Sequence, residues 1–270
     1  MKEETGISWA HFTHNFWLGC DKIASECAHC YIGRDLRKQG RQPWGRLYLT
    51  QTYNNPFDFE SLAKQNKQYV RVFTCSESDF FHAQADKWRA GAWRVIKNCP
   101  HAVWLILTKR PERILRNLPA DWPYANVWLG VSTGCKKTLN KMDVLRDVPI
   151  HPEAVRFVSA EPLLEDISQE IDLTGFGWLV VGGESGGGVE YLWNPAGDWR
   201  AEFSTHGRRT MHLEWAETLR DKVKGAGLSF LFKQITNARP SQSGMSTLIR
   251  PPCRTSGRGG HSRRFQRATC

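Results

Sequence analysis

The sequence predicts an α/β fold, a partial or open (βα) barrel of the TIM type with about six parallel strands. Short hydrophobic runs recur along the chain, helix-like stretches separate them, and polar residues follow the runs directly. Near-continuous hydrophobic runs are typical of parallel strands buried on both faces, and their alternation with helices indicates repeated βαβ units. Because a parallel barrel builds its active site from the loops after the strands, those polar residues are the candidate site.

Six hydrophobic runs are the predicted strands, and a weaker strand is expected before them, at 12–18. The six are Val70–Thr74, Val103–Thr108, Asn126–Val131, Val155–Ser159, Trp178–Val181 and Ser229–Phe232. Four stretches between or beside them are expected to be helical: Ala83–Asn98, Pro111–Leu118, Lys136–Asp147 and His212–Gly225.

The distribution of charge predicts one barrel domain over residues 1–236 and a disordered tail over 237–270. The chain of 270 residues has a net charge of +10, but the tail holds seven arginines and no acidic residue. The tail is also rich in Gly, Ser and Pro and has no hydrophobic period, which is typical of disorder. Such a tail either contacts nucleic acid or is an extension with no selected role.

Nothing at the N-terminus has the pattern of a signal peptide, and the longest hydrophobic runs are too short to span a bilayer. We therefore expect a cytoplasmic protein with no membrane partner. The eight cysteines are unevenly spaced, and three of them fall between positions 20 and 30. In a reducing compartment such a local group indicates a metal site and not a disulfide framework.

The three cysteines form the pattern Cys20-x6-Cys27-x2-Cys30, directly after the weak first strand. Three thiolates within eleven residues can surround one metal centre, but they are one ligand short of a closed zinc site or a fully ligated cubane. Zinc could complete its shell with His29, His11 or His14. A three-cysteine iron–sulfur cubane instead leaves one iron open to a small molecule, and the spacing alone leaves both metals open.

Three residues that follow strands are the candidate catalytic groups. Lys109 and Arg110 supply positive charge suited to a carboxylate or phosphate, or are simply a solvated basic pair. Glu161 could orient a ribose hydroxyl or act as an acid or base, and its structural alternative is an ion pair with Arg110 or Lys233.

Several segments, in order from residue 7 to about 235, resemble a family of phage and prophage proteins with a three-cysteine, radical-SAM-like motif. They include Ile7-Ser8-Trp9, Asn15 to Tyr31 with the three cysteines, Asp79-Phe80-Phe81-His82, Leu107 to Arg113, Asn126 to Ser132, Arg156 to Leu164, Gly182 to Gly186 and Phe230 to Gln234.

The resemblance implies a barrel of the radical-SAM type in which Cys20, Cys27 and Cys30 bind a [4Fe–4S] cluster. The cofactors would be this cluster and S-adenosylmethionine, which is cleaved reductively to methionine and a 5′-deoxyadenosyl radical. An electron donor such as a flavodoxin or ferredoxin is the implied partner. The substrate is unknown, and the phage context and the basic tail suggest a nucleic acid or nucleotide.

The resemblance also suggests cofactor-binding residues, with two departures from the usual radical-SAM pattern. The first gap between cysteines has six residues where three are usual, and the Gly-Gly-Glu segment that usually follows the second strand lies at 182–184. The position after the second strand offers Ser76, Ser78 and Asp79, which we expect to bind the methionine group. His29, Glu184 and Ser185 are further cofactor-binding candidates. A zinc-stabilised nucleic-acid-binding or partner protein without catalysis remains the alternative.

Overall fold

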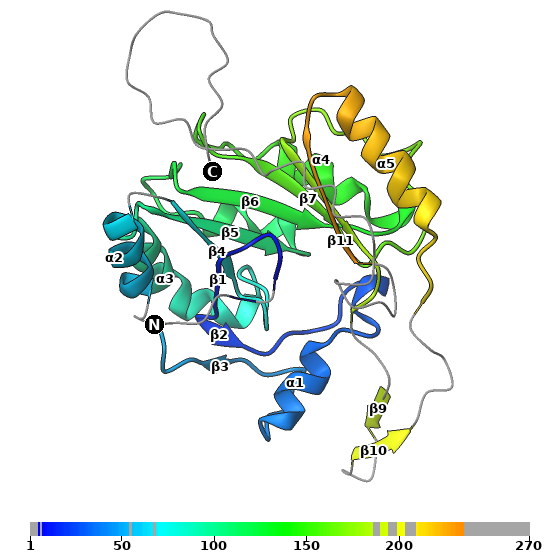
Figure 1. The fold of residues 1–270 in the computed structure, drawn as a ribbon. Helices are drawn as coiled ribbons and strands as arrows, with labels where there is room; N and C mark the ends of the chain where they lie inside the picture. The colour runs from blue at the N-terminus through cyan, green and yellow to red at the C-terminus, as the bar shows by residue number, and fades with distance from the viewer. Residues whose placement is uncertain are drawn as a thin grey trace, which may run out of the picture.

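The structure, a computed structural model, describes residues 5, 7–53, 56–66, 69–185, 190–193, 199–202 and 209–234. Its centre is a seven-stranded sheet in the order β1-β4-β5-β6-β7-β8-β11, in which every neighbouring pair is parallel (Figure 1). The strands are β1 Phe12–His14, β4 Val70–Thr74, β5 Ala102–Thr108, β6 Val127–Ser132, β7 Arg156–Ala160, β8 Trp178–Gly182 and β11 Ser229–Gln234. The predicted α/β open barrel is thereby confirmed.

Five α-helices accompany the sheet within the described residues. They are α1 Ile32–Lys38, α2 Pro56–Asn66, α3 Asp86–Lys97, α4 Asn140–Arg146 and α5 Leu213–Gly225. Helix α2 contacts β5, α4 contacts β6 and β7, and α5 contacts β8 and β11, so these helices cover the outer face of the sheet. Helix α1 lies apart from them in Figure 1, near the short antiparallel pair of β2 (Trp17–Leu18) and β3 (Tyr48–Leu49). A second antiparallel pair joins β9 (Glu190–Trp193) and β10 (Trp199–Glu202).

Two expected elements differ in the structure. The weak strand at 12–18 is divided: β1 joins the main sheet, whereas β2 turns away to pair with β3. The helix expected at Pro111–Leu118 is two 3-10 turns, Pro111–Arg113 and Leu115–Asn117. Pro119 explains the second difference, because a proline drives the preceding residue out of the helical region, and Leu118 is extended.

No helix within the described residues is long and apolar enough to cross a membrane. The predicted tail at 237–270 lies outside the described residues, as does much of the segment between residues 186 and 208.

Side chains alternate between the two faces of the sheet, and both faces are buried. On the outer face, residues such as Trp104 and Leu129 pack beneath the helices. On the inner face, the N-terminal segment inserts Trp9, whose ring centroid lies 4.4 Å from that of Phe73 and 5.9 Å from those of Phe157 and Trp178. This aromatic cluster fills the lower part of the open barrel, so the cavity that remains lies towards the carboxyl ends of the strands.

Candidate functional site

A cavity of about 400 Å³ lies at the carboxyl ends of the strands. Loops from β2, β4, β5, β7 and β8 meet there, as the parallel topology requires. The structure brings all twelve candidate residues to its walls: Cys20, Cys27, His29, Cys30, Ser76, Ser78, Asp79, Lys109, Arg110, Glu161, Glu184 and Ser185.

The cysteine loop, residues 20–30, begins where β2 ends and closes at the start of α1. Gly19 allows the turn into it, because its φ of +96° favours glycine and a Cβ there would lie 2.2 Å from the carbonyl oxygen of Arg46. The Cys20 amide then donates to the Pro43 carbonyl at 3.0 Å, and the Gly45 amide donates to the Cys20 carbonyl at 3.3 Å. The first cysteine is therefore held by its backbone against the loop that precedes β3.

The three thiols are near neighbours in a poorly solvated place. Burial raises the pKa of Cys20 to about 12, Asp79 adds to the rise and Arg110 opposes it. Burial also raises the pKa of Cys30, and a charge on Cys27 would raise it further. Buried thiols of this kind become thiolates when a cationic centre binds them, because the metal compensates the charge.

The donor set fits an iron–sulfur cluster, since three soft thiolates are the ligands such clusters take. Within the described part of the chain, no three His, Cys, Asp or Glu side chains are gathered tightly enough to hold a metal ion as they stand.

Asp79 is the centre of a buried network behind Cys20. Its Oδ1 accepts from the Phe81 amide at 2.9 Å and the Thr108 hydroxyl at 2.7 Å. Its Oδ2 accepts from the Lys109 amide at 3.0 Å and from Arg110 Nη1 at 3.1 Å. A carboxylate has about four acceptor positions, and all four are used here.

Arg110 joins this network to the cysteine loop. Its Nη1 lies 3.7 Å from Cys20 Sγ and its Nη2 donates to the Asp21 carbonyl at 3.1 Å. The guanidinium is buried, so its positive charge acts on the Cys20 sulfur with little screening. Arg110 is thus built into the wall of the cavity and is not a solvated surface residue.

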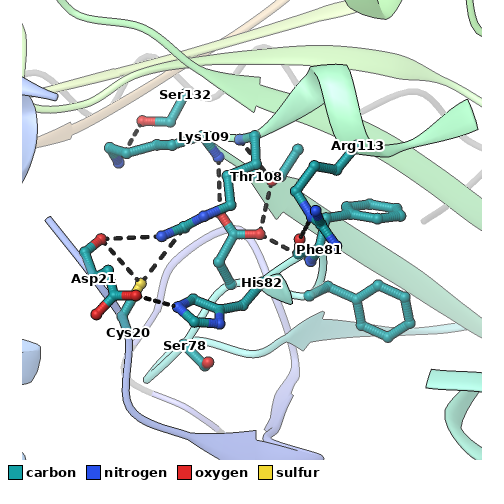
Figure 2. A network of polar contacts seen from close by, with 12 residues as sticks. Cys20, Asp21, Ser78, Phe81, His82, Thr108, Lys109, Arg113 and Ser132 are labelled. Carbon is teal, nitrogen blue, oxygen red and sulfur yellow. Dashed lines mark hydrogen bonds and ion pairs between the residues drawn. The ribbon is translucent and has the colours of Figure 1, made fainter. Parts of the chain in front are cut away.

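Asp21, next to Cys20, forms a second link to the loop after β4 (Figure 2). Its Oδ2 lies 2.8 Å from His82 Nε2, and its Oδ1 accepts from the Gly45 amide at 2.8 Å. His82 Nδ1 accepts from the Gln84 amide at 3.2 Å, so Nε2 carries the proton and donates to Asp21. Burial, reinforced by Arg110, lowers the pKa of His82, which keeps the imidazole neutral near pH 7.

Glu161 has the carboxylate with unused acceptor capacity. Its Oε2 accepts from Ser159 Oγ at 3.3 Å, and its Oε1 forms an ion pair with Lys233 Nζ at 3.3 Å. This Oε1 is buried and accepts no hydrogen bond within the described residues. Gly182 makes room for it, because a Cβ there would lie 2.4 Å from Oε1. The ion pair with Lys233, which was the structural alternative for Glu161, is present. Oε1 can still accept a hydrogen bond from a group in the cavity.

Glu184 fastens the cysteine loop to the end of β8. Its Oε2 lies 2.9 Å from His29 Nδ1 and accepts from the Arg209 amide at 2.8 Å. Its Oε1 accepts from Arg209 Nε at 3.1 Å and also from Nη2. Arg209 Nη1 in turn donates to the Ser25 carbonyl in the cysteine loop at 2.9 Å. We call His29, Glu184 and Arg209 the clamp.

The two serine candidates also have partners in the structure. The Ser78 hydroxyl donates to the Gly19 carbonyl at 2.5 Å, and the Ser76 hydroxyl accepts from Asn15 Nδ2 at 3.1 Å. The Tyr31 hydroxyl donates to the Ser76 carbonyl. Together these bonds tie the loop after β4 to the cysteine loop and to the turn between β1 and β2.

Lys109 lies on the same wall with capacity for a ligand. Its Nζ donates to Ser132 Oγ at 2.8 Å (Figure 2), and Ser132 Oγ donates to the Glu161 carbonyl at 3.0 Å. One of three N–H bonds of the ammonium is used in this way, which leaves two for an anionic group.

Sequence reasoning missed Asp21, Tyr31 and Arg209 as parts of the site. Asp21 and Tyr31 flank the cysteines, so nearness to a predicted ligand was the available signal. Arg209 lies between the last two segments of the resemblance, and nothing in the sequence connects it to Glu184, 25 residues earlier.

Comparison with known proteins places the chain in a family. Residues 4–250 match the family described as "Protein of unknown function (DUF5131)". A solved spore photoproduct lyase mutant with bound AdoMet and dinucleoside spore photoproduct is 12% identical, with a TM-score of 0.46, over 83% of this chain and 76% of that chain. Spore photoproduct lyase complexed with dinucleoside spore photoproduct is also 12% identical, with a TM-score of 0.44, over 80% and 74%. No curated protein matches the chain. Because the family match spans most of the sequence, the chain belongs to the DUF5131 family.

Proposed function

We propose that this protein is a radical-SAM-type iron–sulfur enzyme of the cytoplasm that cleaves S-adenosylmethionine reductively. One observation carries the proposal: three thiols from a single loop share one cavity with fixed charges at the carboxyl ends of the strands. That is where a parallel barrel performs its chemistry. The electron donor is a flavodoxin or ferredoxin, and the substrate is a nucleic acid or nucleotide, in keeping with the phage-type resemblance.

Cys20, Cys27 and Cys30 are the residues that would hold a [4Fe–4S] cluster, with one iron left open. When bound, such a cluster supplies the electron for splitting the sulfonium of S-adenosylmethionine. The roles of the protein are to bind, to orient and to exclude water.

Three groups suit the amino and carboxylate ends of a bound methionine moiety. Glu161 Oε1 lines the cavity beside Lys233 and accepts no hydrogen bond within the described residues, so it fits an ammonium donor. Lys109 Nζ, bonded to Ser132, and Lys233 Nζ, paired with Glu161, line the same cavity and fit a carboxylate. Asp79 and Glu184 have no acceptor position left, so in this proposal they hold the walls and Glu161 meets the ligand.

Arg110 contributes a fixed positive charge next to Cys20 Sγ. It favours the thiolate form of Cys20 and helps to balance the negative charge of a ligated cluster. The aromatic cluster around Trp9 closes the barrel below the cavity, which limits access of water from that side.

Of the three imidazoles considered as a fourth zinc ligand, two lie away from the cavity. His14 is buried against Phe16 and Trp104. His11 Nδ1 accepts from the Arg71 amide at 2.8 Å, and neither His11 nor His14 lines the cavity. His29 alone of the three candidates lines it, and its Nδ1 is engaged by Glu184.

The first test is the metal content after anaerobic purification and reconstitution. We expect about four irons and four sulfides per chain with absorption near 400 nm, lost in Cys20→Ala and Cys30→Ala. Cys99→Ala is the control, because Cys99 is a buried free cysteine that lies outside the cavity. One zinc per chain and no colour would overturn the cluster assignment.

The second test is cleavage of S-adenosylmethionine by the reconstituted protein under dithionite, with 5′-deoxyadenosine and methionine as the measured products. Glu161→Gln should raise the S-adenosylmethionine concentration needed for half-maximal rate by about tenfold, because it removes the negative charge that would face the ammonium group of the ligand. A loaded cluster with no cleavage would refute the activity.

A further inference from the structure

The surface beside the cysteine loop concentrates positive charge. Residues 20–49 contain six basic residues and three acidic ones, whereas the rest of residues 1–236 contains equal numbers. Of the three acidic residues, Glu26 is buried, Asp21 is bonded to His82 and Asp35 forms an ion pair with Arg34. The entire positive excess of the predicted barrel domain therefore resides here. We call the six basic residues the basic flank: Lys22, Arg34, Arg37, Lys38, Arg41 and Arg46.

Aromatic rings lie among these cations. Lys22 Nζ lies 5.3 Å from the centre of the Trp44 ring, and the guanidinium carbons of Arg46 and Arg41 lie 5.1 and 5.9 Å from that of Tyr48. Both rings are half-buried, whereas Lys22, Arg41 and Arg46 are exposed. Cations that follow a backbone of phosphates and rings that stack on bases are the two components of a single-strand binding track.

The basic flank is continuous with the cavity. Trp44 lines the cavity, and its neighbours Pro43 and Gly45 are hydrogen bonded to Cys20. Two further hydrogen bonds hold the same loop from the other side. The Gly45 amide donates to Asp21 Oδ1, and Gln84 Nε2 donates to the Gly45 carbonyl at 2.9 Å. The loop is thus fixed at the mouth of the cavity, and a strand bound along it would lead there.

We propose that the basic flank binds a single-stranded nucleic acid and presents one nucleotide of it to the cavity. Binding stands on the flank itself, and presentation to the cavity rests on the proposed function. Four of the six cations are arginines, whose planar fork pairs with phosphate oxygens and stacks on bases. Trp44 and Tyr48 add stacking that an acidic protein partner would not use.

The test is fluorescence anisotropy of a labelled 20-nucleotide DNA or RNA strand with the full chain, titrated over a range of salt concentrations. The variant replaces three exposed arginines: Arg34→Gln, Arg41→Gln and Arg46→Gln. The matched control removes three charges from α2 and α3: Lys64→Gln, Lys87→Gln and Arg94→Gln. The tail is unchanged in every protein, so its contribution cancels.

We expect the flank variant to lower the salt slope by about two and to weaken binding at least tenfold near 0.1 M salt, because each lost phosphate contact removes about 0.7 from the slope. The control should bind as the wild type does. Tyr48→Leu, which keeps every charge, should weaken binding about fivefold or more through lost stacking.

Equal affinity and slope in the flank variant and the control would overturn the proposal and assign binding to another part of the chain. If the flank variant loses binding to phosphatidylglycerol vesicles but binds the oligonucleotide as the wild type does, the proposal is overturned in favour of a membrane surface. Because the measurement needs neither iron nor S-adenosylmethionine, its result is independent of the proposed activity.

Discussion

At the scale of single residues, Asp79 and Glu184 share a property: each carboxylate uses all four acceptor positions within the protein. Asp79 connects the loops after β4 and β5, and Glu184 connects the cysteine loop to Arg209. Removing a buried carboxylate that accepts from four donors is strongly destabilising, because each donor is then left desolvated without a partner. Both residues therefore hold the cavity in shape.

Replacing Asp79 should be costly. Asp79→Ala leaves the buried Arg110 guanidinium without its ion-pair partner and should lower the free energy of unfolding by about 3–5 kcal/mol in urea titrations. Asp121→Ala is the control: its ion pair with Lys97 is exposed, and the loss should stay below about 1 kcal/mol. Similar losses in the two variants would show that the Asp79 network does not stabilise the fold.

Sequence reasoning identified which residues meet at the cavity but not what each one binds. All twelve candidates line it, because the carboxyl ends of parallel strands meet at one edge. The partner of each side chain depends on contacts between distant parts of the chain. Arg110, for example, contacts Cys20, 90 residues earlier, and no local sequence pattern predicts this contact. The sequence does not reveal the hydrogen-bond partners of Asp79, and this is why Asp79 was expected to bind the methionine group.

At the scale of secondary structure elements, the strands were predictable because a strand buried on both faces appears in the sequence as a continuous hydrophobic run. β4 has the predicted bounds, and the other five main strands differ by at most two residues at an end. Short elements whose packing is tertiary were not predictable. Helix α1 and strand β3 arise where the cysteine loop is held against residues 43–49, and neither has a strong period of its own.

Gly130 lets neighbouring strands pack across the inner face of the sheet. A Cβ at this position of β6 would lie 2.3 Å from the ring of Phe157 on β7. Gly130→Ala should therefore lower the free energy of unfolding by about 1–3 kcal/mol, and adding Phe157→Leu should recover part of the loss. Thermal unfolding of each variant is the measurement. Gly225→Ala, where nothing lies within 4 Å of the added Cβ, is the control and should be neutral or slightly stabilising.

Glu60 attaches α2 to the start of β5. It accepts from the His101 amide at 2.8 Å and lies 2.6 Å from His101 Nδ1. Burial alone would raise the pKa of Glu60, but hydrogen bonds from His101 and Lys64 outweigh it and lower the pKa. Its contribution to stability is therefore present above about pH 4.3, the ordinary value, and is lost as the pH falls through the lowered pKa.

The corresponding measurement compares wild type and Glu60→Gln in urea at several pH values. The difference in the free energy of unfolding should be about 1–3 kcal/mol near pH 6 and should shrink towards pH 3.5. A difference that stays constant with pH would mean that the charge of Glu60 is not what attaches the helix.

At the scale of the whole molecule, the clamp joins parts of the chain that are far apart in sequence. Arg209 reaches the Ser25 carbonyl across 184 residues, and Glu184 reaches His29 across 155. These bonds hold the cysteine loop at its place over the end of β8. The loop is also held by the buried Glu26, whose Oε1 accepts from the Gly134 amide at 3.2 Å and from the Thr138 hydroxyl at 2.6 Å. Its order therefore depends on several distant parts of the chain, the clamp among them.

Loss of the clamp should loosen the cysteine loop without unfolding the barrel. In Arg209→Gln we expect backbone amides of residues 20–30 to exchange with deuterium about tenfold faster, while the β5 and β6 amides keep their protection. Arg146→Gln, which breaks exposed ion pairs with Asp143 and Asp172, is the control and should leave the loop unchanged. Unaltered exchange in Arg209→Gln would show that other contacts order the loop.

The insertion of Trp9 among Phe157 and Trp178 has a consequence for how the protein is made on the ribosome. Phe157 and Trp178 are translated more than 140 residues after Trp9, and Arg209 follows later still. At a synthesis rate of about 5–20 residues per second, this segment and its three cysteines wait on the order of ten seconds or more without their native surroundings. The cysteine loop therefore reaches its native surroundings only after Arg209 has been translated, so its final packing is a late step in the folding of the barrel.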